Sequence, residues 1–247
     1  TATRSERREG VPRAVHSMAY ENAATLGGKC HRMLFEHGTP SRRSPEASPK
    51  KEFKKEGRPM EHPYIPLEDL QAQVAACRRC PLCDGRTQTV FGVGNPEARV
   101  LIVGEAPGKN EDLQGEPFVG AAGKYLNELL AIAGLSREDV YIANVLKCRP
   151  PSNRDPRPEE IQACTPFLRE QTRTINPEYI VTLGNFSTKF ILKTDVGITR
   201  LHGTLQRAGR FKVFPIFHPA AALYDSKKRE ALENDFATLG ELLRGEV

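Results

Sequence analysis

The stretch Val100–Gly108, which reads Val-Leu-Ile-Val-Gly-Glu-Ala-Pro-Gly, sets the interpretation of the whole sequence. Its unbroken apolar run is typical of a strand that is buried on both faces of a parallel sheet. The run ends in a tight Gly/Pro turn that carries one carboxylate, Glu105. Ligands bind beyond the carboxyl ends of the strands in such sheets, so a charged residue there is more often functional than structural. On this segment alone, an ordinary loop with a solvated glutamate is the alternative.

The remaining apolar patterns alternate between strand and helix. We expect strands at Val100–Gly104, Val140–Val145, Tyr179–Leu183 and Lys212–Phe217. We expect helices at Leu67–Cys80, Gly120–Ala133, Pro158–Thr174, Phe186–Leu192 and Lys228–Leu243. Because each strand is apolar throughout, the pattern predicts an α/β fold with three layers, α/β/α, built on a central four-stranded parallel sheet.

Residues with polar or reactive side chains follow the predicted strands. In strand order they are Glu105, Asn144, Gly184–Asn185 and His218. The carboxyl ends of parallel strands lie at one edge of the sheet, where ligands bind. We therefore expect a carboxylate, an amide and an imidazole to meet in one cleft.

Two nucleotide-phosphate motifs are excluded by their spacing. Gly104–Lys109 has three residues between its glycines and continues with Lys-Asn, whereas a phosphate loop needs four and then Lys-Ser or Lys-Thr. Gly92-x-Gly94 precedes a predicted strand, whereas the dinucleotide-binding fingerprint follows one.

The basic charge of the chain is concentrated near its beginning. Residues 1–60 contain 13 of the 36 Lys and Arg residues and 7 of the 31 Asp and Glu residues, a net charge of +6. Residues 61–247 therefore have 23 basic and 24 acidic residues, a net charge of −1. A nucleic-acid surface on the folded part must then be a local patch.

Residues 1–60 have Ser/Pro-rich sequence and no sustained apolar period, which predicts a disordered basic tail before a folded domain at 61–247. Two origins stay open: a natural arm that holds polyanions, or a non-native or upstream-translated segment before a natural start at Met60. We find no signal-peptide core and no apolar run of about 18 residues that would span a membrane. We expect a cytoplasmic, prokaryotic-type protein without membrane partners.

The cysteine spacing indicates a metal centre. Six cysteines without a secretory signal favour reduced thiols or a metal site over disulfides. Cys77-x2-Cys80 lets one turn present two sulfurs to a metal, but Cys148-x15-Cys164 lacks the second close spacing of a zinc ribbon. Four thiolates with an irregular second pair suit an iron–sulfur cluster, with buried unliganded thiols as the alternative. Cys83 is then the spare thiol.

Several linked motifs resemble the family 4 uracil-DNA glycosylases, the iron–sulfur branch of the uracil-DNA glycosylase superfamily. The resemblance extends from about Leu67 to Leu243 in unbroken order. The motifs are Cys77-x2-Cys80-Pro-Leu, Phe91-Gly-x-Gly-Asn-Pro, Gly104-Glu-Ala-Pro-Gly, Pro117-Phe-Val-Gly, Asn144-x3-Cys148-Arg-Pro-Pro, Cys164 and His218-Pro-Ala.

The resemblance implies a cofactor and a substrate pocket. The cofactor is a 4Fe–4S cluster held by Cys77, Cys80, Cys148 and Cys164. The uracil pocket is built from Glu105, Ala106, Pro107, Phe118, Asn144 and His218, with Glu111 near the uracil C5 edge. In one departure from the family pattern, His202 stands where relatives often have arginine. The segment between the last two cysteines has no histidine, so the covalent DNA chemistry of a related branch is not expected.

The implied function is that of a monofunctional glycosylase that flips uracil out of DNA and hydrolyses its N-glycosidic bond, which starts base excision repair. Asn144 would accept a hydrogen bond from uracil N3–H and donate one to O4. Phe118 would stack on the base, and a donor at His218 would stabilise the uracil anion. Glu105 would activate water or offset the cationic character of the sugar, and the sequence leaves both roles open.

The expected partner is single- or double-stranded DNA that contains uracil, bound by a monomer. We expect the loop Ala220–Arg229, with Leu223 and Tyr224, to enter the duplex, and Lys227, Lys228 and Arg229 to hold phosphates. A solvated helix start is the alternative. Two other functions stay open: a glycosylase with broader specificity for deaminated bases, and a non-catalytic iron–sulfur module that binds nucleic acid.

Overall fold

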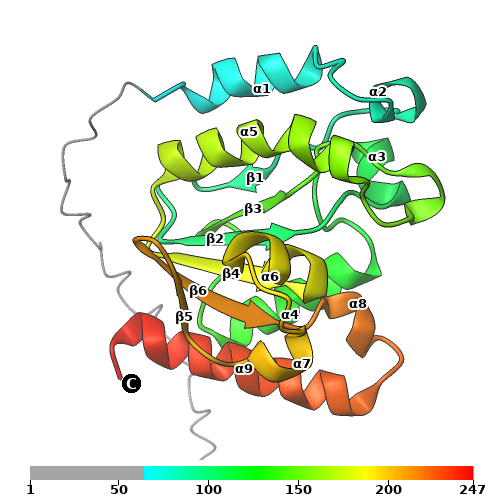
Figure 1. Ribbon diagram of the computed structural model, residues 1–247. Coiled ribbons are helices and arrows are strands. Elements are labelled where there is room, and N and C mark those ends of the chain that lie inside the picture. Colours follow the sequence, from blue (N-terminus) through cyan, green and yellow to red (C-terminus); the bar gives the residue numbers. More distant parts are fainter. Residues whose placement is uncertain (1–63, 247) are drawn as a thin grey trace, which may run out of the picture. The chain divides into compact units, whose positions relative to one another are not determined.

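The computed structural model describes residues 64–246, so the predicted tail at 1–60 lies outside the described part of the chain. The described residues form an α/β fold in which helices cover both faces of a sheet (Figure 1). The strand order across the sheet is β1-β3-β2-β4-β6-β5. The strands are β1 (Val93–Gly94), β2 (Val100–Gly104), β3 (Val140–Asn144), β4 (Tyr179–Leu183), β5 (Gln206–Ala208) and β6 (Phe211–Ile216).

The four predicted strands form the parallel centre of the sheet. β2 pairs with β3 on one side and with β4 on the other, and β4 also pairs with β6. The prediction of a four-stranded sheet needs correction, because β1 and β5 add one antiparallel strand at each edge. Both edge strands are short and have no fully buried residue, so they lack the apolar run that marks the central strands.

The helices form a layer on each face of the sheet. α4 and α9 pack on one face, α5 and α6 pack on the other, and α1 lies on the outer side of α5 (Figure 1). Between residues 64 and 246, no helix has an apolar stretch long enough to cross a membrane. The helices are α1 (Leu67–Ala75), α2 (Leu82–Gly85), α3 (Lys109–Gln114), α4 (Ala121–Ile132), the 3₁₀ turn η1 (Pro151–Asn153), α5 (Pro158–Ile175), α6 (Gly184–Leu192), α7 (Ile198–Leu201), α8 (Pro219–Ala222) and α9 (Ser226–Arg244).

The first helix ends earlier than the sequence predicts. We expected it to reach Cys80, but α1 ends at Ala75. Arg86 donates hydrogen bonds from its guanidinium to the carbonyl of Ala75 (3.0 Å) and to that of Cys77 (2.9 Å), and so satisfies backbone acceptors at the helix end. Pro81 also disfavours helical backbone at the residue before it. Cys77 and Cys80 therefore lie in the loop after the helix.

The central strands place the polar residues at one edge of the sheet. The chain passes from β2 to β3 on one side and then crosses to β4 on the other side of β2, so the strand order reverses next to β2. Open α/β sheets bind ligands at such a switch point, beyond the carboxyl ends of the strands. Gly104, at the end of β2, is paired in register with Asn144, at the end of β3.

Candidate active site and cysteine centre

A cavity of about 410 Å³ opens at the carboxyl ends of β2, β3 and β6. It contains every residue that we predicted to surround the substrate. These residues are Glu105, Ala106, Pro107, Glu111, Phe118, Asn144 and His218. They come from distant parts of the sequence. The parallel sheet brings them together because the carboxyl ends of its neighbouring strands lie at the same edge.

Asn144 presents an unpaired acceptor inside the protein. Its side chain is 2% exposed, and its Oδ1 atom has no hydrogen-bond partner among the described residues. A Cβ at Gly104 would collide with Oδ1 and lie 2.9 Å from the Phe118 ring, so the neighbouring strand must have glycine there. Buried acceptors without partners are rare in folded proteins, and this one lies on the cavity wall. The arrangement fits a ligand that donates a hydrogen bond to Asn144.

Phe118 forms an aromatic wall of the cavity and has a strained backbone. Its ring stacks on that of His218, with centroids 5.6 Å apart and planes 29° apart. Its φ is +55°, in the left-handed region that non-glycine residues rarely adopt. Such a conformation costs about 1–3 kcal/mol and is common at functional sites. The wall offers a flat face to a planar ligand.

His218 is a neutral hydrogen-bond donor in this site. Its Nδ1 accepts a hydrogen bond from the backbone N–H of Ala220 (3.2 Å), which caps α8. The ring proton must then be on Nε2. Burial lowers the pKa of His218 to about 4, against a weaker opposite effect from the Glu111 carboxylate. At neutral pH the imidazole is therefore uncharged and can donate from Nε2.

Two carboxylates in the cavity have different environments. Burial raises the pKa of Glu105, and the charge of Asp155 raises it further. A raised pKa makes a carboxylate a better proton acceptor near neutral pH. Glu111 instead holds the backbone of the Phe118 loop, because its Oε1 accepts hydrogen bonds from the N–H groups of Val119 (3.1 Å) and Gly120 (3.2 Å).

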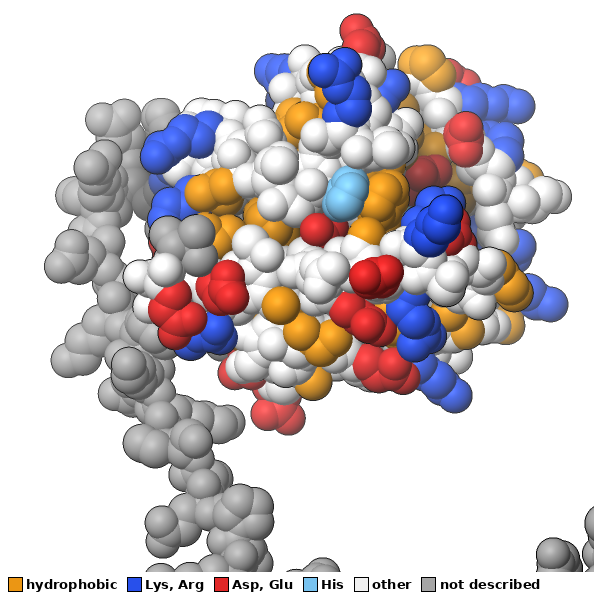
Figure 2. Space-filling model, turned by 90° about the horizontal axis from the view of Figure 1, so that it is seen from below, with side chains coloured by type: hydrophobic (Ala, Val, Ile, Leu, Met, Phe, Trp, Pro, Cys, Tyr) orange, Lys and Arg blue, Asp and Glu red, His pale blue; other side chains and the backbone are white. Residues whose placement is uncertain are grey.

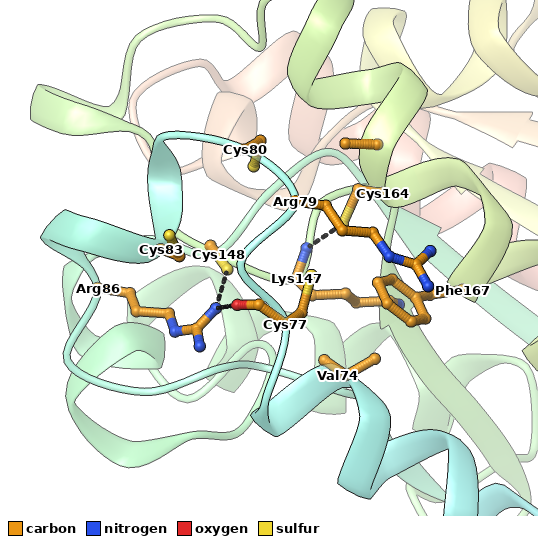
Figure 3. A pocket seen from close by; sticks show the side chains of 11 residues that line it. Val74, Cys77, Arg79, Cys80, Cys83, Arg86, Lys147, Cys148, Cys164 and Phe167 are labelled. Carbon is orange, nitrogen blue, oxygen red and sulfur yellow. Dashed lines mark hydrogen bonds between the residues drawn. The ribbon is translucent and has the colours of Figure 1, made fainter.

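The predicted metal ligands line a second hollow, beside α1 and α5 (Figure 3). It is narrow, with a volume of about 10 Å³ on the measure that gives about 410 Å³ for the first cavity. Cys77, Cys80, Cys148 and Cys164 line it, and the predicted spare, Cys83, lines it too. In the described part of the chain, no group of three or more Cys, His, Asp or Glu side chains has the geometry to hold a metal ion. The thiols share one hollow but do not form a closed ion cage.

Hydrogen-bond donors near Cys148 and Cys164 distinguish these two predicted ligands from Cys83. Burial raises the pKa of Cys148 and raises that of Cys164 to about 11. Against burial, the Arg86 guanidinium donates to Cys148 (3.4 Å) and the backbone N–H of Lys147 donates to Cys164 (3.2 Å), as the dashed lines in Figure 3 show. Donors of this kind favour the thiolate form that binds metals.

Cys80 and Cys83 also differ in the groups that contact their thiols. Burial also raises the pKa of Cys80, and a hydrogen bond from the backbone of Leu82 opposes that effect. Cys83 points its thiol at the Asp84 carboxylate (3.4 Å), which adds to desolvation in raising its pKa. The surroundings of Cys80, Cys148 and Cys164 thus fit thiolates that bind a metal group, and those of Cys83 do not.

The comparison with known families agrees with this geometry. The model of the Uracil DNA glycosylase superfamily matches residues 91–239. The chain belongs to this superfamily. A Type-4 uracil-DNA glycosylase of Archaeoglobus fulgidus is 50% identical over 184 residues, which cover 71% of this chain and 92% of the relative.

Two further relatives carry the names of two types of uracil-DNA glycosylase, and the Type-4 relative is the more similar of the two. A Type-4 uracil-DNA glycosylase of Thermotoga maritima is 48% identical over 159 residues, which cover 64% of this chain and 83% of the relative. A Type-5 uracil-DNA glycosylase of Pyrobaculum aerophilum is 30% identical over 211 residues, which cover 72% of this chain and 90% of the relative. The family 4 resemblance that the motifs predict is confirmed.

In this member of the uracil-DNA glycosylase superfamily, the loop between α8 and α9 exposes its two candidate wedge residues to different extents. Leu223 is half-buried and packs against the core under α4 and α9, whereas Tyr224 is 95% exposed. In the basic run that follows, Lys228 pairs with Asp225 (3.2 Å) and Arg229 lies over the Tyr125 ring (4.4 Å). Lys227 is exposed. Of the two candidates, Tyr224 is therefore the more exposed.

The charges of this superfamily member are mixed on the face seen in Figure 2, where blue and red side chains alternate without a large block of either sign. This agrees with the net charge of −1 in residues 61–247 and with contact to DNA through local patches. His202, the departure from the family pattern, pairs through Nδ1 with Asp235 (3.0 Å) and packs on Phe217 (4.4 Å between centroids). The side chain thus supports α9 from the loop before β5.

Sequence reasoning missed two basic residues that support the site of this glycosylase family member. Lys147 is 1% exposed, and its ammonium donates to the Asn144 carbonyl (2.8 Å) and to Gln171 Oε1 (2.6 Å). The signal was present, because a lysine interrupts an otherwise apolar run just before Cys148. Arg137 donates to the carbonyls of Pro117 and Phe118, and no local pattern marks it.

Proposed function

We propose that this chain is a monofunctional uracil-DNA glycosylase, which releases uracil from DNA and leaves an abasic site. The observation that supports this most directly is the unpaired Oδ1 of Asn144 in a cavity lined by Phe118 and His218. A base can enter such a cavity only after it is flipped out of the helix. Membership of the superfamily and the names of the Type-4 relatives support the same reaction.

Asn144 would discriminate between uracil and cytosine. Uracil has an N3–H donor and an O4 acceptor, so an asparagine amide can accept from the first and donate to the second. Cytosine has an acceptor at N3 and a donor at its exocyclic amine, which is the opposite pattern. Because Oδ1 is buried, an unpaired contact with the wrong base would be costly.

His218 and Glu105 would assist bond cleavage by acting on different reacting groups: His218 on the departing uracil, and Glu105 on the attacking water or the sugar. Breaking the bond between the sugar and N1 leaves negative charge on uracil, and a neutral Nε2–H donor at His218 would stabilise it as it develops. Glu105 has a raised pKa, which favours its role as the group that positions or activates water. A carboxylate there would also offset the cationic character of the sugar.

Strand cleavage is not expected from this cavity. A lyase reaction needs an amine that forms a Schiff base with the sugar. Among the described residues that line the cavity there is no lysine. The product should therefore be an intact strand with an abasic site.

A labelled oligonucleotide that contains one uracil tests this proposal. We expect no strand break before alkali treatment and complete breakage at the uracil position after it. Matched oligonucleotides with hypoxanthine or xanthine should remain intact; their cleavage would indicate broader specificity for deaminated bases. Absence of alkali-labile sites in all of them, with DNA binding retained, would favour a non-catalytic module. Breaks at uracil without alkali would contradict the monofunctional assignment.

We further propose that Cys77, Cys80, Cys148 and Cys164 hold a 4Fe–4S cluster with a structural role. The donors around three of these thiols fit the thiolate form, and the arrangement of Cys83 does not. When bound, the group would supply four iron–thiolate bonds that cross-link the chain. The segment between Cys148 and Cys164 provides Pro150, Asn153 and Arg154 to the wall of the substrate cavity, so pinning it would support that wall.

We also propose that Tyr224 enters the duplex next to the flipped uracil. The ring is exposed, and it lies between the His218 loop and the first turn of α9. That turn has Lys227, Lys228 and Arg229, although the positive end of the helix dipole disfavours cations. A phosphate backbone held there would offset this cost.

Tyr224→Ala should lower uracil excision from double-stranded DNA by roughly tenfold, because stacking on a base contributes about 1–3 kcal/mol. Excision from single-stranded DNA should fall much less, since no base pair has to be opened. Leu223→Ala is the matched control: it should lower the melting temperature, whereas Tyr224→Ala should not. An unchanged ratio of double- to single-strand rates would show that Tyr224 is not the wedge.

A further inference from the structure

The conformation of Phe118 needs an external constraint. A phenylalanine at φ +55° returns to negative φ unless its surroundings prevent this. Gly123 on α4 permits the conformation, because a Cβ at that position would collide with the Phe118 carbonyl. The Glu111 carboxylate on α3 is one constraint, through the N–H groups of the two residues that follow Phe118.

Arg137 provides a second constraint from outside the cavity. It lies in the turn between α4 and β3, about twenty positions after Phe118 in sequence. Its Nη1 donates to the Phe118 carbonyl (2.9 Å) and its Nη2 to the Pro117 carbonyl (2.7 Å). Nη1 also reaches Asn127 Oδ1 on α4 (3.2 Å). The guanidinium therefore holds the two carbonyls on either side of the strained Phe118 Cα.

The turn that carries Arg137 is itself well fixed. Asp139 accepts hydrogen bonds from the backbone N–H of Ser136 (2.8 Å) and from its hydroxyl (2.7 Å). Burial lowers the pKa of Arg137, which remains charged because its ordinary pKa is far above neutrality. The planar guanidinium of arginine has N–H donors at fixed positions that can bind two adjacent carbonyls, whereas a lysine ammonium has no such fixed geometry.

We propose that Arg137 is a positioning residue for base recognition: it holds the Pro117 and Phe118 carbonyls so that the Phe118 ring stays stacked against His218 and faces the flipped base. This inference rests on the proposed glycosylase function. Arg137 acts through the Phe118 ring and does not touch the substrate. A contact with DNA phosphate is disfavoured, because Arg137 shares its hollow with Glu116 and Glu138.

A double-mutant cycle with Arg137→Gln and Phe118→Ala tests this inference. We expect Arg137→Gln to lower the single-turnover rate at saturating protein by about tenfold, as expected for lost charge-assisted hydrogen bonds. Combined with Phe118→Ala, the same substitution should change the rate by less than about twofold. Arg137→Lys should recover only part of the loss. Independent, multiplicative effects of the two substitutions would overturn the inference.

Two controls distinguish a positioning effect of Arg137 from the loss of a positive charge and from a loss of protein stability. Arg207→Gln removes an exposed arginine from β5, at the opposite edge of the sheet, and should leave the rate unchanged. Rates are measured where every variant is folded by circular dichroism. If Arg137→Gln lowered the melting temperature and left the rate unchanged, Arg137 would have a structural role only.

A crystal structure of Arg137→Gln tests the inference without any activity. We expect Phe118 to leave positive φ or its ring to move off His218. An unchanged Phe118 backbone and ring would refute the positioning role even if uracil excision were confirmed. Conversely, an inactive wild type with a displaced ring in the variant would contradict the glycosylase proposal but not the structural coupling.

Discussion

Asn144→Asp is expected to lower uracil excision by about two orders of magnitude or more, as is typical when a buried polar pair is broken. An ionised aspartate would still accept from uracil N3–H but would repel O4. The site is buried, so solvent cannot compensate for the lost donor. Single-turnover rates on uracil-containing oligonucleotides measure the effect directly.

The same variant should lose its selectivity for uracil. Facing cytosine, an aspartate can accept from the exocyclic amine and, when protonated, donate to N3, so weak release of cytosine is expected. Asn144→Ala is the control: it should lose uracil excision without gaining activity on cytosine. A near-native rate and selectivity in Asn144→Asp would mean that Asn144 does not read the base and that the pocket is assigned wrongly.

The centre of the fold could be predicted because its strands are buried on both faces. Val100–Gly104 and Tyr179–Leu183 are strands with the predicted bounds. The strand predicted at Val140–Val145 ends one residue earlier, and the one predicted at Lys212–Phe217 begins and ends one residue earlier. The edges could not be predicted, since β1 has only two residues and is formed by pairing with β3. The end of α1 depends on Arg86, which comes from eleven positions beyond Ala75, so no local pattern marks it.

The candidate site likewise has residues that the sequence could predict and residues that it could not. Residues that follow the strands, such as Glu105, Asn144 and His218, could be placed from topology, because the carboxyl ends of parallel strands share an edge. Arg137 could not be found, since its role depends on contacts with a loop far from it in sequence. The packing of α8 and α9 decides that Tyr224 is more exposed than Leu223, and the local sequence does not specify that packing.

The substrate cavity and the cysteine hollow are connected through Lys147. Its backbone N–H contacts Cys164, and its ammonium contacts the carbonyl of Asn144 and the side chain of Gln171. Gln171 in turn donates to the Phe91 carbonyl (2.9 Å). The order of the cysteine region and the position of Asn144 are therefore expected to depend on each other.

Cys164→Ala should abolish stoichiometric iron binding and lower the melting temperature by roughly 10 °C, which for a domain of this size corresponds to ~3–4 kcal/mol. Cys164 is buried on α5 and, if it is a ligand, ties the segment from Cys148 to that helix. Uracil excision should fall with it, because that segment also lines the substrate cavity. Iron and sulfide analysis, absorption near about 400 nm and thermal melts measure the three effects.

Cys83→Ala is the matched control, since Cys83 lines the same hollow but faces Asp84. It should keep iron content, absorption and melting temperature close to those of the wild type. The contrast between the two variants excludes a general effect of losing a thiol, because both remove one sulfur from the same hollow. Stoichiometric zinc in protein prepared without oxygen would contradict the cluster. Equal loss of iron in both variants would instead make Cys83 a ligand, against the environment that its Asp84 neighbour creates.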